Sequence, residues 1–376
     1  MDSLAVYVHV PFCVRKCSYC DFNAYSGLGS LAEGYVQSVR QEISQSAERG
    51  RHVSTVFFGG GTPTYLSGGQ LAGILDDVRF TFAVDPDAEI SAEVNPTTVD
   101  ASKFAAMRAA GFNRLSIGVQ SFDDRLLKLV DREHSADEAE EAVRAARYAG
   151  FENISIDLMF GLPQQTESDW DATLDRAIAL GTEHLSLYAL TIEPGTRFER
   201  MHAGGRLALP AEDAEVWMYE HAIDRLTGAG FKHYEVSNFA KPGYRARHNL
   251  VYWRNEEYAG FGPGAVSYLA GRRWTNEKHP SRYIAAVRSG HDLAIDSEEL
   301  APVAALSETL IQGLRLMDGI SLSELGSRFE VDAQEHFAPA IQKLTTAGLL
   351  ERSNDTVRLT HRGLLFANDV AIELLA

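Results

Sequence analysis

The chain has 376 residues, a length that predicts two or three domains, or one large barrel with an appendage. Hydrophobic residues make up 45% and charged residues 23%, which excludes disordered and low-complexity proteins. It carries 35 Lys and Arg against 52 Asp and Glu, a net charge of −17, so nucleic acid is a poor candidate partner. No apolar run reaches the roughly 18 residues of a membrane-spanning helix. The N-terminal Met-Asp-Ser-Leu lacks the basic start of a signal peptide. We expect a cytoplasmic protein with no transmembrane segment.

Short runs that are rich in β-branched and aromatic residues alternate with helical patterns along the first half of the chain. Six strands are predicted, at residues 5–10, 55–58, 89–94, 114–119, 153–160 and 184–190. A helix is predicted over 33–49, and residues 135–138 and 166–169 have the pattern of helix starts. Alternating strands and helices are typical of βα units in a parallel sheet, so the fold class is α/β.

The C-terminal residues have a different pattern. Helices are predicted over 304–317, 321–329 and 333–347, followed by a hairpin of 349–352 and 357–360 and a last helix over 363–375. Helices followed by a hairpin are typical of a small winged-helix-like α+β domain. Residues 301–376 contain ten acidic and six basic side chains, which argues against DNA binding. We therefore expect a core domain at 1–235, an aromatic-rich connecting segment at 236–300 and a C-terminal domain at 301–376.

All three cysteines of the chain, Cys13, Cys17 and Cys20, lie in one short segment. An odd number of cysteines argues against a disulfide framework. The spacing C-x3-C-x2-C suits thiolate ligands of a soft metal or of an iron–sulfur cluster. Zinc is the alternative, but a structural zinc site takes four ligands, and the nearest histidine, His9, lies in a predicted strand. Three ligands on a four-iron cluster leave one iron open to another molecule.

Residues 7–20, YVHVPFCVRKCSYC, resemble the signature of radical S-adenosylmethionine (SAM) proteins. More narrowly, they resemble the family of oxygen-independent coproporphyrinogen III oxidase and its heme-chaperone relatives. The resemblance implies an incomplete (β/α)6 barrel with its chemistry at the C-terminal ends of the strands. It also implies that the cysteines hold a [4Fe-4S] cluster and that SAM binds the open iron and is cleaved to a 5′-deoxyadenosyl radical.

The candidate SAM contacts begin after the second predicted strand. Gly60, Gly61 and Thr62 resemble the GGGTP motif of the family, where glycines let a ligand approach the backbone and leave N–H groups free for a carboxylate. Glu93 ends the third strand among apolar neighbours, and a buried carboxylate needs a partner. That partner is a ribose hydroxyl or ammonium group of SAM, or an arginine within the barrel.

Further candidates follow the later strands. Gln120 ends the fourth strand in a GVQ motif, Arg132 comes twelve residues later, and Asp157 interrupts an apolar fifth strand. The resemblance implies that these three contact SAM, whereas the residues alone also allow an ion pair between Arg132 and Asp157 that closes the barrel. The resemblance places Tyr7 and Tyr19 against SAM and the cluster, with core aromatics as the alternative.

The segment 231–268 is rich in aromatic residues. It contains His248-Asn249-Leu250-Val251-Tyr252-Trp253, which resembles the HNxxYW motif of the heme-chaperone branch. Imidazole is a suitable axial ligand for heme iron, and aromatic faces suit a flat macrocycle. His248 is therefore a candidate heme contact, with a structural histidine as the alternative.

Two departures separate the chain from the oxidase. Phe22 stands where the oxidase signature has a fourth cysteine. Because Cys13 lies close to the first residue of the sequence, we also expect the chain to lack the extension that precedes the cluster strand in the oxidase. With HNxxYW, these departures imply a heme chaperone that binds the cluster, SAM and heme and transfers heme to an acceptor protein. The alternative is the oxidase itself, which decarboxylates coproporphyrinogen III in porphyrin biosynthesis. No general acid or base can be assigned, and homodimerisation and peripheral contact with membrane heme proteins stay open.

Overall fold

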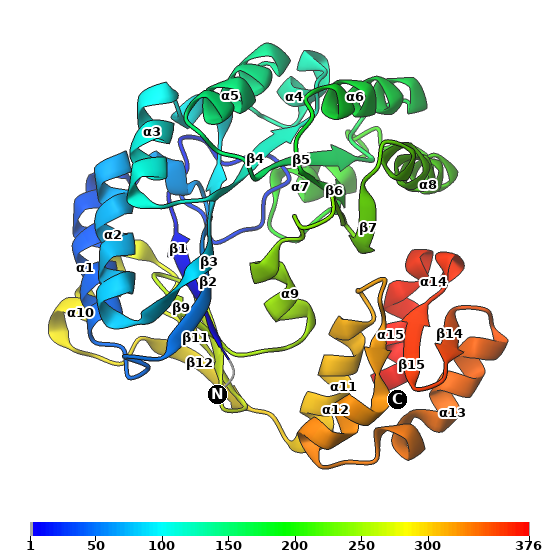
Figure 1. Ribbon diagram of the computed structural model, residues 1–376. Helices are drawn as coiled ribbons and strands as arrows, with labels where there is room; N and C mark the ends of the chain where they lie inside the picture. The colour runs from blue at the N-terminus through cyan, green and yellow to red at the C-terminus, as the bar shows by residue number, and fades with distance from the viewer. Residues whose placement is uncertain (1–2, 376) are drawn as a thin grey trace.

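Six parallel strands form the centre of the larger domain (Figure 1). They are β1 (Leu4–Val10), β2 (His52–Gly60), β3 (Ala83–Val94), β4 (Arg114–Gln120), β5 (Ile154–Phe160) and β6 (His184–Ala189). Each strand pairs with the next one along the chain, and each overlaps a predicted strand. Within residues 3–375, which this computed structural model describes, β6 does not pair with β1, so the barrel is incomplete as expected.

Helices cover the outer face of this sheet (Figure 1). They are α1 (Ala32–Ser44), α2 (Gly68–Thr81), α3 (Ala101–Ala110), α5 (Ala136–Tyr148), α6 (Glu167–Ala179) and α8 (Glu212–Gly228). The short helices α4 (Asp124–Leu129) and α7 (Arg197–Ala203) pack together beside the loop that carries the cysteines. The predicted helix starts are confirmed, because Ser135 and Thr166 form capping boxes with Glu138 and Asp169. Three short 3-10 turns complete the connections, η1 (Gly29–Leu31), η2 (Pro63–Tyr65) and η3 (Pro96–Thr98).

The alternation of side chains along the strands separates the core from the barrel interior. On β4, Leu115, Ile117 and Val119 are fully buried in the hydrophobic core, whereas the alternate residues Ser116 and Gln120 line a cavity inside the barrel. Successive side chains of a strand point to opposite faces of the sheet. The polar residues that interrupt these otherwise apolar strands therefore converge on one interior space.

Residues 232–299 extend the sheet at both edges. The hairpin of β7 (Lys232–Glu235) and β8 (Asn238–Ala240) lies beside β6, and β9 (Tyr258–Phe261) runs parallel to β1 at the opposite edge. The antiparallel strands β10 (Val266–Leu269), β11 (Arg272–Asn276) and β12 (Ala294–Glu299) follow β9 in a sheet of 12 strands. Two helices belong to this stretch, α9 (Arg247–Trp253) and α10 (Pro280–Ser289). Helix α9, which carries the HNxxYW motif, lies between the sheet and the C-terminal domain (Figure 1).

The C-terminal domain has the expected order of helices followed by a hairpin. Its elements are α11 (Pro302–Gly313), β13 (Ile320–Ser321), α12 (Leu322–Phe329), α13 (Ala333–Thr346), β14 (Leu350–Ser353), β15 (Thr356–Leu359), α14 (His361–Leu365) and α15 (Ala367–Leu375). The prediction of one last helix was wrong, since the chain forms two. The Thr360 side chain accepts a hydrogen bond from the Gly363 N–H and begins α14, and the Phe366 N–H closes a tight turn on the Gly363 carbonyl that ends it.

The C-terminal domain is joined to the larger domain by specific polar contacts. The Asn255 side chain, just after α9, donates to Thr309 of α11 (3.0 Å), and Arg273 of β11 pairs with Glu308 (2.8 Å). Arg328 of α12 donates to the carbonyl of Arg254 (2.8 Å). Among residues 3–375, no helix is long and apolar enough to cross a membrane.

Candidate functional site

A cavity of about 490 Å³ lies at the C-terminal ends of the parallel strands. Ten of the predicted site residues line it: Cys13, Cys17, Tyr19, Cys20, Gly61, Thr62, Glu93, Gln120, Arg132 and Asp157. Thr191, which the sequence left undecided, and Phe22 lie on the same wall. Tyr7, Gly60 and His248 do not line this cavity. The volume falls in the range of roughly 300–1,000 Å³ that is usual for small-molecule sites.

The three cysteines lie on the loop between β1 and α1. The Cys13 Sγ is 3.5 Å from the Thr62 hydroxyl, and the Cys17 Sγ is 3.9 Å from the guanidinium of Arg132. Burial raises the pKa of the Cys13 thiol and raises the pKa of Cys20 to about 11. Among residues 3–375, no three side chains are drawn together as a preformed metal site. Three thiols on one cavity wall, beside a cation that offsets thiolate charge, are nevertheless a donor set that fits an iron–sulfur cluster.

The glycine-rich loop after β2 packs against β1 and the cysteine loop. The N–H of Gly61 donates to the Val10 carbonyl and the N–H of Thr62 to the Phe12 carbonyl, both at 2.8 Å. The N–H of Gly60 donates to the Glu93 carboxylate at 3.0 Å. The expectation that these N–H groups are free for a ligand carboxylate was therefore wrong, because groups of the protein accept all three.

The same loop shows why glycine is needed there. Gly60 has a φ of +115°, and a Cβ at this position would lie 2.6 Å from the imidazole of His9. A Cβ on Gly61 would lie 2.8 Å from the Phe12 carbonyl oxygen and 3.1 Å from the Cys13 Sγ. The glycines therefore set the distance between the loop and Cys13.

Among the acidic residues that line the cavity, Glu93 and Asp157 come from the barrel strands, and neither forms an ion pair with an arginine within residues 3–375. Burial and the nearby charge of Asp157 raise the pKa of Glu93 to about 8. Burial also raises the pKa of Asp157, which accepts a hydrogen bond from Ser116 at 2.8 Å. In the described part of the chain Arg132 bonds to the Gly118 carbonyl and to Cys17, so the ion pair between Arg132 and Asp157 is not formed. The two acids are thus placed to accept hydroxyl or cationic groups of a ligand.

The end of β4 has an unusual backbone. Gln120 has a φ of +68°, in the left-handed region that non-glycine residues rarely adopt. A Cβ on Gly118 would lie 3.0 Å from the Gln120 side chain and 3.2 Å from the Arg132 guanidinium. Gly118 therefore makes room for both side chains over the cavity. Such strain persists where surrounding structure enforces it and is common at ligand sites.

An inner cavity of about 310 Å³ lies deeper in the barrel. Tyr7 and His248 line it, and it shares Glu93 and Asp157 with the larger cavity. The Nε2 of His9 donates to the Asn23 carbonyl (3.0 Å), so its Nδ1 accepts from the Tyr7 hydroxyl (3.1 Å). Burial lowers the pKa of His9 to about 4, which keeps the ring neutral. The hydrogen bond to His9 therefore fixes Tyr7 in the wall of the inner cavity, whereas the cysteines line the outer one.

His248 is enclosed by protein groups. Its Nδ1 lies 2.9 Å from the Thr55 hydroxyl and its Nε2 lies 3.0 Å from the Tyr252 hydroxyl. The ring stacks on Phe57 with centroids 5.1 Å apart, and only 1% of the residue is exposed. Burial lowers its pKa to about 3. In this arrangement neither ring nitrogen is open to a heme iron.

Sequence reasoning missed several residues on the cavity walls. Ser116 and Tyr188 line both cavities, and Lys16 lines the outer one. A signal for Ser116 was present, because it precedes Gln120 by four residues on β4 and must face the same side. Tyr188 is related in the same way to Ser186 on β6, which also lines the inner cavity.

Comparison with known proteins identifies the family. The Radical SAM superfamily profile matches residues 7–177, and that of the HemN C-terminal domain matches residues 300–366. The heme chaperone HemW of Bacillus subtilis is 38% identical, over 97% of both chains. The HemW of Mycobacterium tuberculosis is 40% identical, over 98% of this chain and 94% of the relative. The chain belongs to the HemW family of radical SAM proteins.

A solved structure of a related enzyme has the same fold as this chain. Coproporphyrinogen III oxidase (HemN) from Escherichia coli matches with a TM-score of 0.86 and 27% identity, covering 99% of this chain and 90% of the oxidase. This match confirms the expected radical SAM barrel with a smaller C-terminal domain. The two HemW chaperones share more identity with the chain than this oxidase does. The expected place in the heme-chaperone branch is therefore confirmed.

Proposed function

We propose that this protein is a heme chaperone that binds a [4Fe-4S] cluster, SAM and heme, and passes heme to an acceptor protein. The observation that carries the proposal is the identity of 38% and 40% with two chaperones over nearly the whole chain. Phe22 adds support, because it replaces the fourth cysteine of the oxidase signature and lies on the wall of the cysteine cavity.

In this proposal Cys13, Cys17 and Cys20 are the cluster ligands. Bound there, the cluster would leave one iron for SAM and supply the electron for its reductive cleavage. Arg132, whose guanidinium is near Cys17, offsets the negative charge of the thiolates. Tyr19 is packed into a hydrophobic cluster beside the cysteines and limits the access of water.

The walls of the cavity would orient SAM. Glu93 and Asp157 would accept hydrogen bonds from its ammonium group or ribose hydroxyls, and Gln120 at the end of β4 and Arg132 in the loop after α4 would offer donors. Gly60, Gly61 and Thr62 act by holding the loop against Cys13, with their own N–H groups satisfied within the protein. Tyr7 supports the cavity from below through the neutral ring of His9.

The proposal is tested by adding hemin or coproporphyrinogen III to the anaerobically reconstituted full-length protein in the presence of SAM. We expect one hemin per chain, with a shifted Soret band, and no protoporphyrinogen IX. Subsequent addition of a heme-free apoprotein such as apomyoglobin should move the Soret band to that of the loaded acceptor. Turnover of coproporphyrinogen III, or the absence of hemin binding, would overturn the proposal.

The oxidase remains the second candidate, because the fold matches that of the Escherichia coli enzyme so closely. The same experiment separates the two functions, since the oxidase must consume SAM in proportion to the product that it forms. Phe22→Cys serves as a further check. If the missing fourth thiol alone accounts for the lack of oxidase turnover, this variant gains it.

A further inference from the structure

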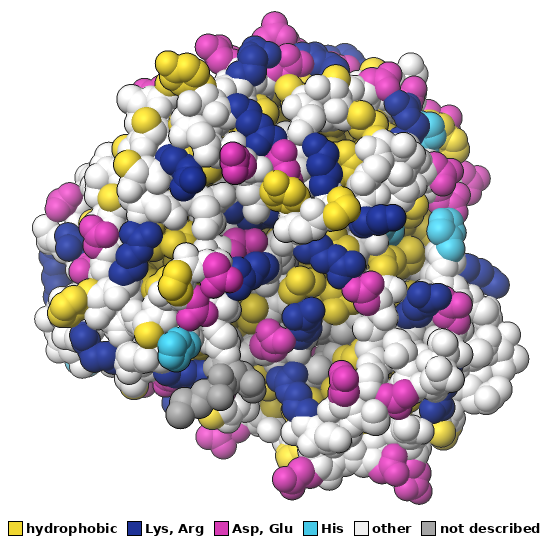
Figure 2. Space-filling model, viewed as in Figure 1, with side chains coloured by type: hydrophobic (Ala, Val, Ile, Leu, Met, Phe, Trp, Pro, Cys, Tyr) yellow, Lys and Arg dark blue, Asp and Glu magenta, His cyan; other side chains and the backbone are white. Residues whose placement is uncertain are grey.

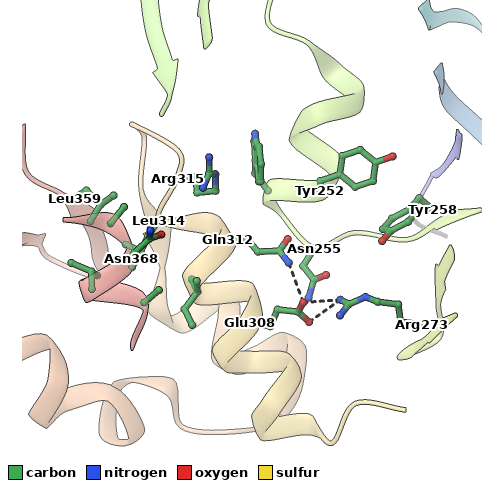
Figure 3. A pocket seen from close by; sticks show the side chains of 15 residues that line it. Tyr252, Asn255, Tyr258, Arg273, Glu308, Gln312, Leu314, Arg315, Leu359 and Asn368 are labelled. Carbon is green, nitrogen blue, oxygen red and sulfur yellow. Dashed lines mark hydrogen bonds and ion pairs between the residues drawn. The ribbon is translucent and has the colours of Figure 1, made fainter. Parts of the chain in front are cut away.

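A second large cleft, of about 500 Å³, separates the barrel from the C-terminal domain (Figure 3). One side is formed by α9, β9 and β11, and the other by α11 and α15. Its wall combines aromatic and charged side chains: Tyr252, Trp253, Tyr258, Arg273, Glu308 and Arg315. In the space-filling view, Lys and Arg side chains lie around the central hollow of this face, with Asp and Glu side chains among them (Figure 2).

Two donors on this wall have no partner in the described part of the chain. They are the indole Nε1 of Trp253 and the Nε of Arg315, both buried and both without a hydrogen bond. The guanidinium of Arg315 lies over the Trp253 ring, 4.5 Å from its centroid. A buried donor without an acceptor is costly, so these two atoms mark a strained contact in the cleft wall.

The two arginines of the cleft differ in their surroundings. Arg273 forms ion pairs with Glu308 (2.8 Å) and Glu298 (3.1 Å), so its charge is already balanced. In Figure 3 dashed contacts join Glu308 to Arg273 and to Gln312, whereas no dashed contact reaches Arg315, which lies just after α11. Within residues 3–375 no carboxylate lies within ion-pair distance of Arg315. Burial raises the pKa of the Glu235 carboxyl, and the charge of Arg315 acts against this larger effect and lowers that pKa. Arg315 is therefore the arginine of the cleft lining that has no carboxylate at ion-pair distance in the described part of the chain.

We infer that this cleft, rather than the barrel interior, is where the protein binds heme. The inference rests on the proposed chaperone function and specifies its site. The aromatic walls contact the macrocycle, and a heme propionate accepts hydrogen bonds from the terminal nitrogens of the Arg315 guanidinium, which lies over the Trp253 ring. The cleft is large enough for a small-molecule ligand, and a flat apolar ring with carboxylates matches both its aromatic surface and the Arg315 guanidinium.

His248 is then a positioning residue and not an axial ligand. Its Nε2 is bonded to the hydroxyl of Tyr252, and the Tyr252 ring lines both the inner cavity and the cleft. Removing the imidazole frees this ring and perturbs the cleft wall without removing any atom that touches heme. The phenols of Tyr252 and Tyr258 are the ligand-type atoms of the lining, since none of its residues is His, Cys or Met.

The inference is tested by titrating the full-length protein with hemin and with hemin dimethyl ester, which lacks both carboxylates. For Arg315→Gln, loss of a charged hydrogen bond should weaken hemin binding by about tenfold or more and leave the dimethyl ester nearly unaffected. Trp253→Ala should weaken both ligands, and Trp253→Phe should weaken hemin less than Ala does. The matched controls are Arg254→Gln, an exposed neighbour outside the cleft, and Trp217→Phe on α8.

The outcomes distinguish this inference from the proposed function. If the wild-type protein binds no hemin, both fail. If it binds hemin but Arg315→Gln and Trp253→Ala bind it as tightly as wild type does, the cleft is rejected and the chaperone function stands. Unchanged cluster content and melting temperature show that each variant is folded.

The position of the Soret band tests the role of His248 separately. For His248→Ala we expect weaker hemin binding with an unchanged band, because the iron keeps its ligand. A band shift from imidazole-ligated to unligated heme would show that His248 ligates the iron, and it would overturn the assignment to the cleft.

Discussion

The raised pKa of Glu93 predicts that SAM binding depends on pH. Its carboxyl group lies in the cysteine cavity, accepts a hydrogen bond from the Gly60 N–H and has a pKa of about 8 instead of 4.5. Below pH 8 the group is therefore mostly protonated in the ligand-free protein. If Glu93 binds the ammonium group of SAM, the ligand selects the ionised form, and affinity is lost as the pH falls through 8.

The size of the effect follows from the pKa. One pKa unit corresponds to about 1.4 kcal/mol, so ionising Glu93 costs about 1.4 kcal/mol at pH 7 and about 2.7 kcal/mol at pH 6. The dissociation constant for SAM should therefore be about tenfold higher at pH 7, and about a hundredfold higher at pH 6, than on the plateau above pH 9. The Gln side chain of Glu93→Gln cannot ionise, so in this variant the pH dependence of SAM affinity that Glu93 causes disappears.

The assay is anaerobic calorimetric titration of SAM into the reconstituted protein between pH 6 and 9. The amino group of SAM titrates in the same range, so the informative quantity is the ratio of the dissociation constants of Glu93→Gln and wild type. We expect the ratio to rise with pH and to level off near pH 9, about one pH unit above the pKa of Glu93. A ratio that does not change with pH would refute the reasoning, provided that the iron content is constant across the series.

Three further predictions concern the same site. Cys17→Ser should lower iron and sulfide after anaerobic reconstitution, as measured by chemical analysis, and retention of both would exclude Cys17 as a ligand. Gly60→Ala adds backbone strain and a contact with the His9 ring, so it should destabilise the protein by about 2–4 kcal/mol in thermal unfolding. Gly50→Ala, where φ is +83° but the space is open, should cost about 1–2 kcal/mol, and equal losses would contradict the steric argument. Arg132→Gln should weaken SAM binding by about tenfold, whereas the surface variant Arg144→Gln on α5 should not change it.

The barrel could be predicted from the sequence because its signals are local. Strands β1 to β6 are short apolar runs between turns, and the capping residues Ser135 and Thr166 mark the starts of α5 and α6 within four residues of sequence. The candidate residues followed from the same rule, since residues at the ends of parallel strands meet at one edge of the sheet. Ten of them do line one cavity.

Features that depend on long-range contacts could not be predicted. The N–H groups of the glycine loop are satisfied by Glu93 and by carbonyls of residues 10–12, and nothing in the GGGTP pattern reveals those partners. Strands β9 to β12 join the sheet beside β1, more than 240 residues away in sequence, so local periodicity does not predict their place. The contacts of Arg132 could not be predicted either, because its bonds to Gly118 and Cys17 depend on how the loop after α4 folds back.

The geometry of α9 explains how one short motif serves two sites. Residues four apart on a helix lie on nearly the same face, whereas residues five apart are rotated by about 140°, since each residue turns the helix by about 100°. His248 and Tyr252 therefore meet on the face toward the barrel, where their side chains are hydrogen-bonded. Trp253 points away from His248, toward α11, where it meets Arg315. The contact between His248 and Tyr252 follows from their spacing in the sequence. The contact between Trp253 and Arg315 does not, because Arg315 lies 62 positions later and comes near only when the C-terminal domain packs on α9.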